Sequence, residues 1–406
     1  MSHQDPILAN NTFTASASVS RADGLTALDS AIFNRDDWDK MTRSAALELK
    51  LAALSDSLKH HSENCKEFGD YCERKSFDPW KELYPQDLAS IPQIPTSAFK
   101  VGEILSVPSS QIIRRFESSG TSGTRSKILR DEITLARLSG SLRSSAEVWS
   151  DVIGDRDLED DIFVIHLGPS RKDAGTVWFG YVMSLIELEA ETEHMMKNGK
   201  VDLHAASALI RSALQEGKRV LVVGAPFLVE ELCKAFQNSP ICAGSNLFLL
   251  TGGGWKKNIS KAISQSDLAS LAAKSFGIDS PSQLRDVFNQ VELNSAFVQC
   301  SEGRLHSPPW VEVIVRDPLS WKPLDSGQIG LLTYLDPTAH SYPGFIAGED
   351  LGSKEEHACS CGRTTQSIRI VRRLNVSSHQ GCSLQLQEKK EEKSDKDKLG
   401  KSNDPF

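Results

Sequence analysis

The sequence lacks any apolar run approaching the roughly 18 residues that a membrane-spanning helix needs. It also lacks a basic start followed by an apolar stretch, so residues 1–20 do not read as a secretory signal. The formal net charge is -8, and without a basic excess there is no reason to expect a nucleic acid partner. From these absences we expect a cytoplasmic protein without a membrane span.

The composition is that of an ordinary globular protein. The chain has 406 residues, 39% of them hydrophobic and 25% charged, which is enough for one large domain or two ordinary ones. Eight cysteines are present, but a chain of this length without an export signal is not expected to carry a disulfide framework. Four of the cysteines follow residue 299, and this clustering indicates metal or thiol chemistry.

The pattern along the chain predicts an α/β fold. Apolar spacing predicts helices over 36–75, 131–150 and 202–216. Short apolar runs at 162–168, 219–226 and 246–254 alternate with helices, as buried strands of a mainly parallel sheet do. A proline-punctuated stretch over 76–100 is expected to be extended and irregular.

The two ends and the last third of the chain differ from the rest in composition and in the pattern of apolar residues. Residues 1–35 are rich in Ser, Thr and Asn, and we expect a disordered or extended lead. Residues 305–385 contain strand-like runs joined by turns, which predicts a β-rich part within a domain spanning 36–385. Residues 386–406 are densely charged and predict a disordered tail.

The sharpest local motif is FESSGTSGTRSK at 116–127. Small residues allow close backbone approach to a ligand, hydroxyl and N–H groups donate to phosphate oxygens, and Arg125 and Lys127 add positive charge. A flexible Ser/Gly linker is the alternative, although linkers seldom run straight into a charged segment that starts a helix. The candidate phosphate contacts are Ser119, Gly120, Thr121, Ser122, Gly123 and Thr124.

Two pairs of potential metal ligands lie in the last third of the chain. Cys300 and His306 form one pair, and Cys359 and Cys361 form the other. Three thiolates and one imidazole are a normal ligand set for structural Zn²⁺. His357 is an alternative to His306, and buried or free thiols without a metal are the alternative to the site as a whole.

Several motifs resemble those of known families. The segment SSGTSGTRSK is similar to the ATP-phosphate loop of adenylate-forming enzymes, usually Ser-Gly-Thr-Thr-Gly-x-Pro-Lys, with Lys127 one place late. The blocks IPTSAFK, TGGGWK, PPWVEVIVRDP and SYPGFIAGEDLG resemble the acyl-protein synthetases, the synthetase subunit of the fatty-acid reductase complex in bacterial bioluminescence. The likeness runs in order from about residue 94 to about residue 385.

The resemblance implies both a fold and an activity. The fold would be the large N-terminal domain of an adenylate-forming, acyl-CoA-synthetase-like enzyme, with a β-rich subdomain and without the usual full C-terminal domain. The activity would be activation of a carboxylic acid of the fatty-acid type. With ATP and Mg²⁺ the enzyme would form an acyl-AMP, release pyrophosphate and transfer the acyl group to a cysteine thiol.

The resemblance also implies roles for particular residues. Glu292 would bridge Mg²⁺, Asp350 would bind the ribose hydroxyls, Arg363 would contact the nucleotide, and Lys127 would supply catalytic positive charge. The adenine would lie on the backbone of the glycine run, which consists of Gly252, Gly253 and Gly254.

Cys382 is implied as the acyl carrier, because the acyl-protein synthetases hold the acyl group on a cysteine near the C-terminus in a similar Gly-Cys context. An acyl-accepting reductase or transferase is the partner that such a carrier would serve. A phenylacetate-type acyl-CoA or aryl-CoA ligase is an alternative function. A non-catalytic nucleotide-binding scaffold is a third, because Asn289 and Val291 replace the glycine and threonine of the superfamily motif.

Overall fold

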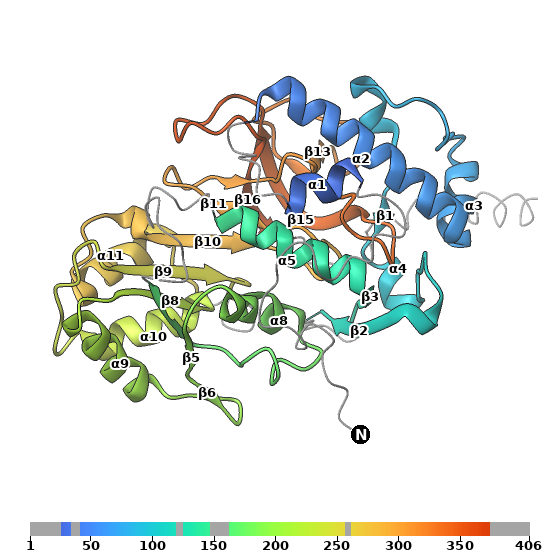
Figure 1. Ribbon diagram of the computed structural model, residues 1–406. Coiled ribbons are helices and arrows are strands. Elements are labelled where there is room, and N and C mark those ends of the chain that lie inside the picture. Colours follow the sequence, from blue (N-terminus) through green and yellow to red (C-terminus); the bar gives the residue numbers. More distant parts are fainter. Residues whose placement is uncertain (1–25, 34–40, 119–124, 147–161, 256–260, 374–406) are drawn as a thin grey trace, which may run out of the picture.

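The computed structural model describes residues 26–33, 41–118, 125–146, 162–255 and 261–373. These residues build one large mixed sheet with helices packed against it (Figure 1). The strand order is β13-β14-β15-β16-β12-β11-β10-β9-β8-β4-β5, and β1 pairs with β15. The sheet has a parallel half and an antiparallel half, which meet between β10 and β11.

The parallel half consists of β4 (Ile162–His166), β5 (Thr192–His194), β8 (Arg219–Gly224), β9 (Leu247–Gly252) and β10 (Leu284–Phe288). Every residue of β4 and β9 is buried, which is expected where helices cover both faces of a parallel sheet. The strand predictions at 162–168, 219–226 and 246–254 are confirmed, because continuous apolar runs of this length fit buried strands.

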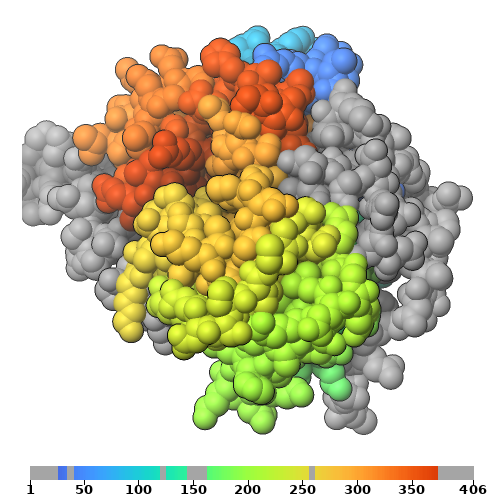
Figure 2. All heavy atoms as spheres, turned by 90° about the vertical axis from the view of Figure 1, so that its left-hand side faces the viewer, coloured from blue at the N-terminus to red at the C-terminus, as the bar shows by residue number. Residues whose placement is uncertain are grey.

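Helices cover this parallel half on both faces. On one face lie α9 (Leu203–Gln215), α10 (Pro226–Phe236) and α11 (Gln265–Phe276), which share an apolar core with β8 and β9. On the other face, Phe179 and Met183 of α8 (Trp178–Ser184) pack on the alternate residues of the same strands. Figure 2 shows α9 to α11, in green and yellow, below the orange and red antiparallel half.

The antiparallel half begins at β11 and includes the β-rich part expected from residue 305. It consists of β11 (Phe297–Gln299), β12 (Leu305–His306), β13 (Glu312–Arg316), β14 (Gly330–Leu335), β15 (Phe345–Glu355) and β16 (Ser367–Arg373). Strand β1 (Ile94–Pro95) adds to β15 in parallel. The β-rich part therefore shares one continuous sheet with the α/β part.

The helices α1 (Ala27–Phe33), α2 (Arg43–Asn64), α3 (Lys66–Arg74) and α5 (Glu132–Ala146) pack beside the antiparallel half. Helix α1 corrects the expectation of a disordered or extended lead over 1–35. Leu28 and Ile32 lie one helical turn apart and are buried, and Asp29 forms an ion pair with Arg137 of α5 at 2.7 Å. Residues 1–25 lie outside the described part of the chain.

The helix predictions over 36–75, 131–150 and 202–216 are confirmed for the described residues. The first helix is interrupted at Cys65, whose extended backbone separates α2 from α3. The proline-punctuated stretch, expected to be extended and irregular, also contains the short helices η2 (Pro85–Ser90) and α4 (Ala98–Val101). No helix among the described residues has the length and apolarity to span a membrane.

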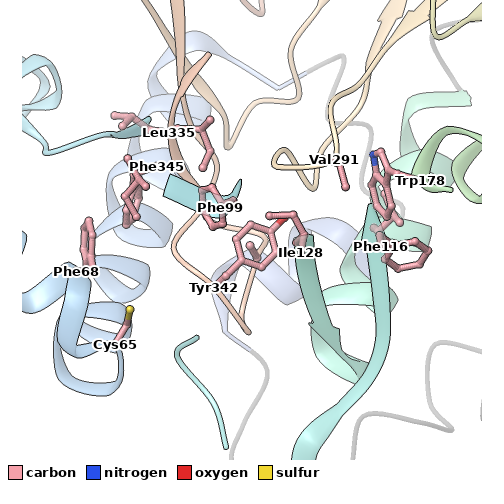
Figure 3. Close-up of a cluster of buried hydrophobic side chains, with 14 of the residues drawn as sticks. Cys65, Phe68, Phe99, Phe116, Ile128, Trp178, Val291, Leu335, Tyr342 and Phe345 are labelled. Carbon is pink, nitrogen blue, oxygen red and sulfur yellow. The ribbon is translucent and has the colours of Figure 1, made fainter. Parts of the chain in front are cut away.

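The remaining elements are short. They are η3 (Ser109–Gln111), η5 (Leu185–Leu188), η7 (Pro281–Gln283), the hairpin of β2 (Ile112–Glu117) and β3 (Lys127–Asp131), and the hairpin of β6 (Met196–Lys197) and β7 (Lys200–Val201). The hairpin of β2 and β3 places Phe116 and Ile128 in the largest apolar core, together with Trp178, Val291 and Tyr342 (Figure 3).

Candidate active site

The phosphate-loop motif spans the end of β2 and the start of β3, which pair with each other in antiparallel fashion. Its two ends are hydrogen-bonded to each other, because Ser118 N donates to Ser126 O at 3.0 Å and Ser126 N donates to Ser118 Oγ at 3.1 Å. Lys127 is exposed and stands opposite Glu117 in the hairpin register. The candidate phosphate contacts of this loop, Ser119, Gly120, Thr121, Ser122, Gly123 and Thr124, lie outside the described residues.

The glycine run ends strand β9 at the carboxyl edge of the parallel sheet, where ligands commonly bind in open α/β folds. Gly253 and Gly254 have left-handed φ angles of 71° and 62°. A Cβ on Gly253 would lie 2.6 Å from the ring of Phe179, whereas a Cβ on Gly254 would meet open space. Phe179 therefore covers one side of the backbone on which the adenine was expected to lie.

The segment 288–292 begins at the last residue of β10, the strand that pairs with β9. The Asn289 amide donates to Leu293 O at 3.0 Å and to Ser295 O at 2.8 Å, and its oxygen accepts from the Trp178 indole N–H. Asn289 thus closes the loop that carries Glu292, in place of the glycine that the superfamily motif has there. Phe288 lies 6.1 Å, centroid to centroid, from Phe297 and contributes to the core.

Two buried carboxyl groups, those of Glu292 and Asp350, lie in the segments that the sequence singled out. The Gln290 amide donates to Asp350 Oδ2 and so joins the segment 288–292 to β15. Burial raises the pKa of Glu292, and the neighbouring Ser126 hydroxyl opposes that rise only in part. Burial also raises the pKa of Asp350, with Arg373 opposing it. At both residues the neighbouring groups offset only part of the cost of burying the charged carboxylate. Such a carboxylate is chemically suited to binding a divalent cation or a sugar hydroxyl.

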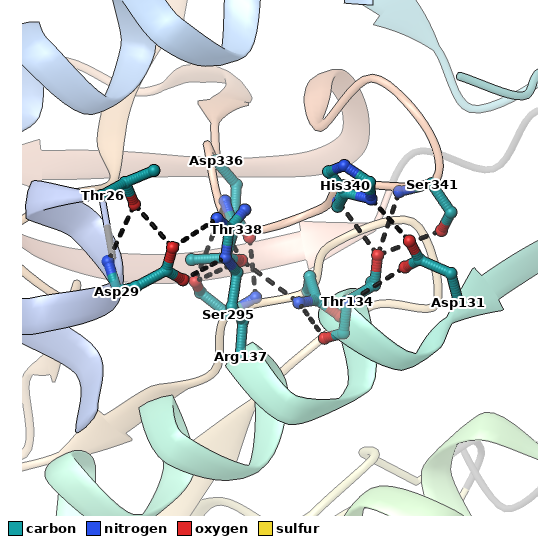
Figure 4. Close-up of polar contacts among 11 residues, drawn as sticks. Thr26, Asp29, Asp131, Thr134, Arg137, Ser295, Asp336, Thr338, His340 and Ser341 are labelled. Atoms are coloured by element: carbon teal, nitrogen blue, oxygen red, sulfur yellow. Dashed lines mark hydrogen bonds and ion pairs between the residues drawn. The ribbon is translucent and has the colours of Figure 1, made fainter. Parts of the chain in front are cut away.

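Polar contacts behind this segment hold it in place (Figure 4). Asp336, at the end of β14, accepts from Ser295 N at 2.7 Å and from Ser295 Oγ at 3.0 Å. Asn294 donates to Thr134 O of α5 at 2.9 Å. Because the loop is bonded on both sides to buried elements, Glu292 is held by a rigid support.

A second group of charged residues at this site is not evident from the sequence. Glu349 precedes Asp350 and accepts from Thr96 Oγ1 at 2.9 Å, Lys100 Nζ at 3.0 Å and Arg373 Nη2 at 2.8 Å. Thr96 and Lys100 belong to the IPTSAFK block, which therefore contacts the GEDLG block directly. The wide sequence separation between the two blocks hid this contact.

Arg130 was also missed, although a signal for it exists. It lies two residues after Ile128 on β3, so the two side chains point to the same face of the strand. A charged residue therefore occupies a position on the face that carries a buried apolar residue. Its guanidinium is fully buried and donates to Val291 O at 2.7 Å and to Tyr342 OH at 3.0 Å. Arg130 thereby connects β3, the strand that begins at the end of the phosphate-loop motif, to the segment that carries Glu292.

The four predicted metal ligands come together. The ligand atoms of Cys300, His306, Cys359 and Cys361 all lie within 4.8 Å of one another. His357, the alternative ligand, is exposed and is not a member of this cluster. Arg363, the expected nucleotide contact, donates to Cys361 Sγ at 3.7 Å and so lies beside these thiols. Cys382 lies outside the described residues.

Comparison with known proteins identifies the family to which the chain belongs. The family model described as acyl-protein synthetase, LuxE, matches residues 16–390. The long-chain-fatty-acid–luciferin-component ligase of Vibrio harveyi is 33% identical over 365 residues, which cover 89% of this chain and 93% of that protein. The ligase of the same name from Aliivibrio fischeri is 35% identical over 329 residues, covering 80% and 84%. The chain belongs to the acyl-protein synthetase family.

As an acyl-protein synthetase, the chain is an acid–thiol ligase that activates an acid through an acyl-adenylate and transfers the acyl group to a protein thiol. Its fold is similar to that of 2-hydroxyisobutyryl-CoA ligase, solved in an open conformation with 2-HIB-AMP and CoA. The TM-score is 0.62 at 15% identity, covering 84% of this chain and 77% of that one. The predicted adenylate-forming fold is thereby confirmed.

Proposed function

We propose that this acyl-protein synthetase adenylates a long-chain fatty acid and holds the acyl group on Cys382 before passing it to an acyl-accepting partner protein. The two relatives from Vibrio harveyi and Aliivibrio fischeri are long-chain-fatty-acid–luciferin-component ligases, which supports the choice of a long-chain fatty acid. The contact between Gln290 and Asp350 carries the assignment of the site, because it unites two distant motifs beside the carboxyl edge of the parallel sheet.

The first step brings two anions together. A carboxylate oxygen of the acid attacks the α-phosphorus of ATP, the bond from that phosphorus to the bridging oxygen breaks, and pyrophosphate leaves. Lys127 and the donors of the loop 119–124 would hold the phosphates, Asp350 the ribose, and the glycine run the adenine. Mg²⁺, held by Glu292, would supply neutralisation of the phosphate charge when bound.

The second step moves the acyl group to sulfur. The Cys382 thiolate attacks the carbonyl carbon of the acyl-adenylate, a C–S bond forms, and the C–O bond to AMP breaks. A thioester persists longer in water than the mixed anhydride yet stays reactive towards a second acceptor. This step requires Cys382 to reach the adenylate first and the partner afterwards.

Two measurements test the proposal. ATP–pyrophosphate exchange with fatty acids of graded chain length reports adenylation, and labelling of the protein with radioactive acid reports the hydroxylamine-sensitive thioester. Cys382→Ser should keep the exchange and lose the label. Cys242→Ser is the matched control, because Cys242 is exposed and should be dispensable for both. Wild-type labelling of Cys382→Ser would assign the carrier to another residue.

The same assays separate the alternatives. Acyl-CoA formation at the rate of exchange, without a labelled protein, would indicate a CoA ligase instead. Absence of exchange with every acid would indicate the nucleotide-binding scaffold. If exchange occurs with short or aromatic acids but with no long-chain acid, the acid class proposed here is wrong while adenylation stands.

A further inference from the structure

The cluster of Cys300, His306, Cys359 and Cys361 is built by two turns of the same form. In the first, Cys300 N donates to Arg304 O at 2.9 Å and Gly303 N donates to Cys300 O at 3.0 Å. In the second, Cys359 N donates to Arg363 O at 3.1 Å and Gly362 N donates to Cys359 O at 2.9 Å. The two turns present their ligands towards each other from 59 residues apart in sequence.

A glycine with positive φ completes each turn. Gly303 has a φ of 71° and Gly362 a φ of 93°, and each lies three residues after the first cysteine of its turn. This backbone conformation lets the chain fold back tightly, so that the cysteine side chain and the residues after the turn face the same point. Nothing in the adenylation chemistry requires two such matching turns.

The spacing of the ligand atoms fits one tetrahedral ion. Cys300 Sγ and Cys359 Sγ are 3.9 Å apart, and Cys361 Sγ is 3.4 Å from His306 Nε2. A tetrahedral Zn²⁺ with Zn–S bonds of about 2.3 Å places its sulfur ligands about 3.8 Å apart. A disulfide would require an S–S distance of about 2.05 Å, so the two sulfurs are not bonded to each other.

The surroundings of the cluster also fit a metal better than packed thiols. His306 is buried, and its Nδ1 lies 3.2 Å from Thr365 Oγ1, which leaves Nε2 directed at the sulfurs. An outer hydrogen bond of this kind orients most metal-bound histidines. Three thiolates and a neutral imidazole around Zn²⁺ carry one net negative charge, and the buried Arg363 guanidinium at Cys361 Sγ balances it.

We propose that these four residues bind one structural Zn²⁺, and that Arg363 serves this ion rather than the nucleotide. The ion joins the turn between β11 and β12 to the turn between β15 and β16. Strand β16 then pairs with β15, where Arg373 stands opposite Asp350. The metal thus secures the register of the two strands that carry part of the candidate active site. This inference does not depend on the acid or on the acyl carrier proposed above.

Elemental analysis of the full-length protein, purified without chelators, tests the proposal. About one zinc per chain is expected. Replacement by Co²⁺ should give the intense visible absorption of a tetrahedral site and a near-ultraviolet sulfur-to-cobalt charge-transfer band. Thr365→Val should weaken metal affinity by roughly 10- to 100-fold, because it removes the hydrogen bond that orients His306.

The variants need a matched thiol control and a rescue. Cys359→Ser should lose most of the metal, whereas Cys233→Ser, which alters a fully buried cysteine outside the cluster, should keep it. His306→Cys offers four thiolates and should still bind zinc if Cys359→Ser fails to fold. Absence of zinc together with absence of the charge-transfer band after cobalt addition overturns the proposal. Equal metal loss in Cys233→Ser, or a Cys300–Cys359 disulfide in freshly purified protein, does so as well.

Discussion

The guanidinium carbon of Arg130 lies 3.6 Å from the centroid of the Trp178 ring, deep in the core between the β2–β3 hairpin and α8. Burial lowers the pKa of Arg130, and the oxygens that accept its hydrogen bonds, those of Val291, Tyr342 and Asn294, are uncharged. The arginine guanidinium is planar, so it can stack on an indole and also donate hydrogen bonds along its edges. The lysine ammonium cannot do both.

We therefore expect Arg130→Lys to reduce the free energy of unfolding by roughly 2 to 4 kcal/mol, because lysine cannot replace both the stack and the directed hydrogen bonds. Urea unfolding measures the effect. Arg125→Lys is the control, since Arg125 is exposed and pairs with Glu117 at 3.3 Å; its effect should stay within about 0.5 kcal/mol. Equal stability of the two variants would show that the stacked geometry is unimportant.

The glycine run gives a second prediction. Gly253→Ala should destabilise the protein more than Gly254→Ala. Both substitutions impose a left-handed conformation on alanine, at about 1–2 kcal/mol, but only the first also places a methyl group 2.6 Å from the Phe179 ring. Thermal unfolding of the two variants measures the difference. Adding Phe179→Leu should restore part of the loss to Gly253→Ala and none to Gly254→Ala; restoration of neither would assign the penalty to backbone strain alone.

Much of this fold follows from local sequence patterns. The strand runs IFVIHLG and RVLVVGAP are apolar apart from His166 and Arg219, and a sheet covered on both faces accommodates that pattern. The α1 helix escaped prediction because its stability depends on tertiary contacts: seven residues are too few to form a stable helix alone, and Arg137 of α5 supplies the partner of Asp29.

Long-range pairing limited the prediction of the site. The sequence singled out Asp350 and Glu292 by motif, and the candidate metal ligands by residue type and spacing. It gave no sign that Lys100 would meet Glu349, because 249 residues separate them. Arg363 shows a second limit. A motif match predicts a contact with the nucleotide, whereas the sulfur atom beside its guanidinium is evident only from the three-dimensional arrangement.

Acid should destabilise the protein through His166. Gly168 N donates to its Nδ1 at 3.0 Å, and burial lowers the pKa of His166 to about 4, with nearby His194 adding to the effect. The folded-state pKa is thus below the unfolded value of about 6.5, so the unfolded chain binds the proton first as pH falls. Stability present at neutral pH should decline progressively between about pH 6.5 and pH 4, by up to about 3 kcal/mol.

His166→Gln tests this pH dependence. The variant should lose stability at neutral pH, because glutamine does not fit the imidazole site, but its stability should fall less steeply with acid than that of the wild type. His204→Gln, at an exposed position of α9, should follow the wild-type curve. Chemical unfolding at several pH values measures both slopes. Parallel curves for His166→Gln and the wild type would assign the acid sensitivity to other groups.

The neighbours Glu349 and Asp350 should respond in opposite directions to removal of their charge. Burial alone would raise the pKa of Glu349, but Arg373 and Lys100 together lower it, so its charged form is favoured by folding. Glu349→Gln should therefore reduce stability at neutral pH. For Asp350, burial raises the pKa in spite of Arg373, so folding disfavours its charge. Asp350→Asn should keep or increase stability at neutral pH.

Function separates the pair as well. Asp350→Asn is expected to lose ATP–pyrophosphate exchange by at least about tenfold, because an amide cannot accept hydrogen bonds from both ribose hydroxyls as a carboxylate can. If Asp350→Asn is stable but inactive, Asp350 is a residue that serves binding while its buried charge lowers the stability of the fold. Unfolding curves and exchange rates should be measured on the same preparations. An Asp350→Asn protein that is folded and fully active would remove Asp350 from the nucleotide site, and one that is both unstable and inactive would assign it a structural role.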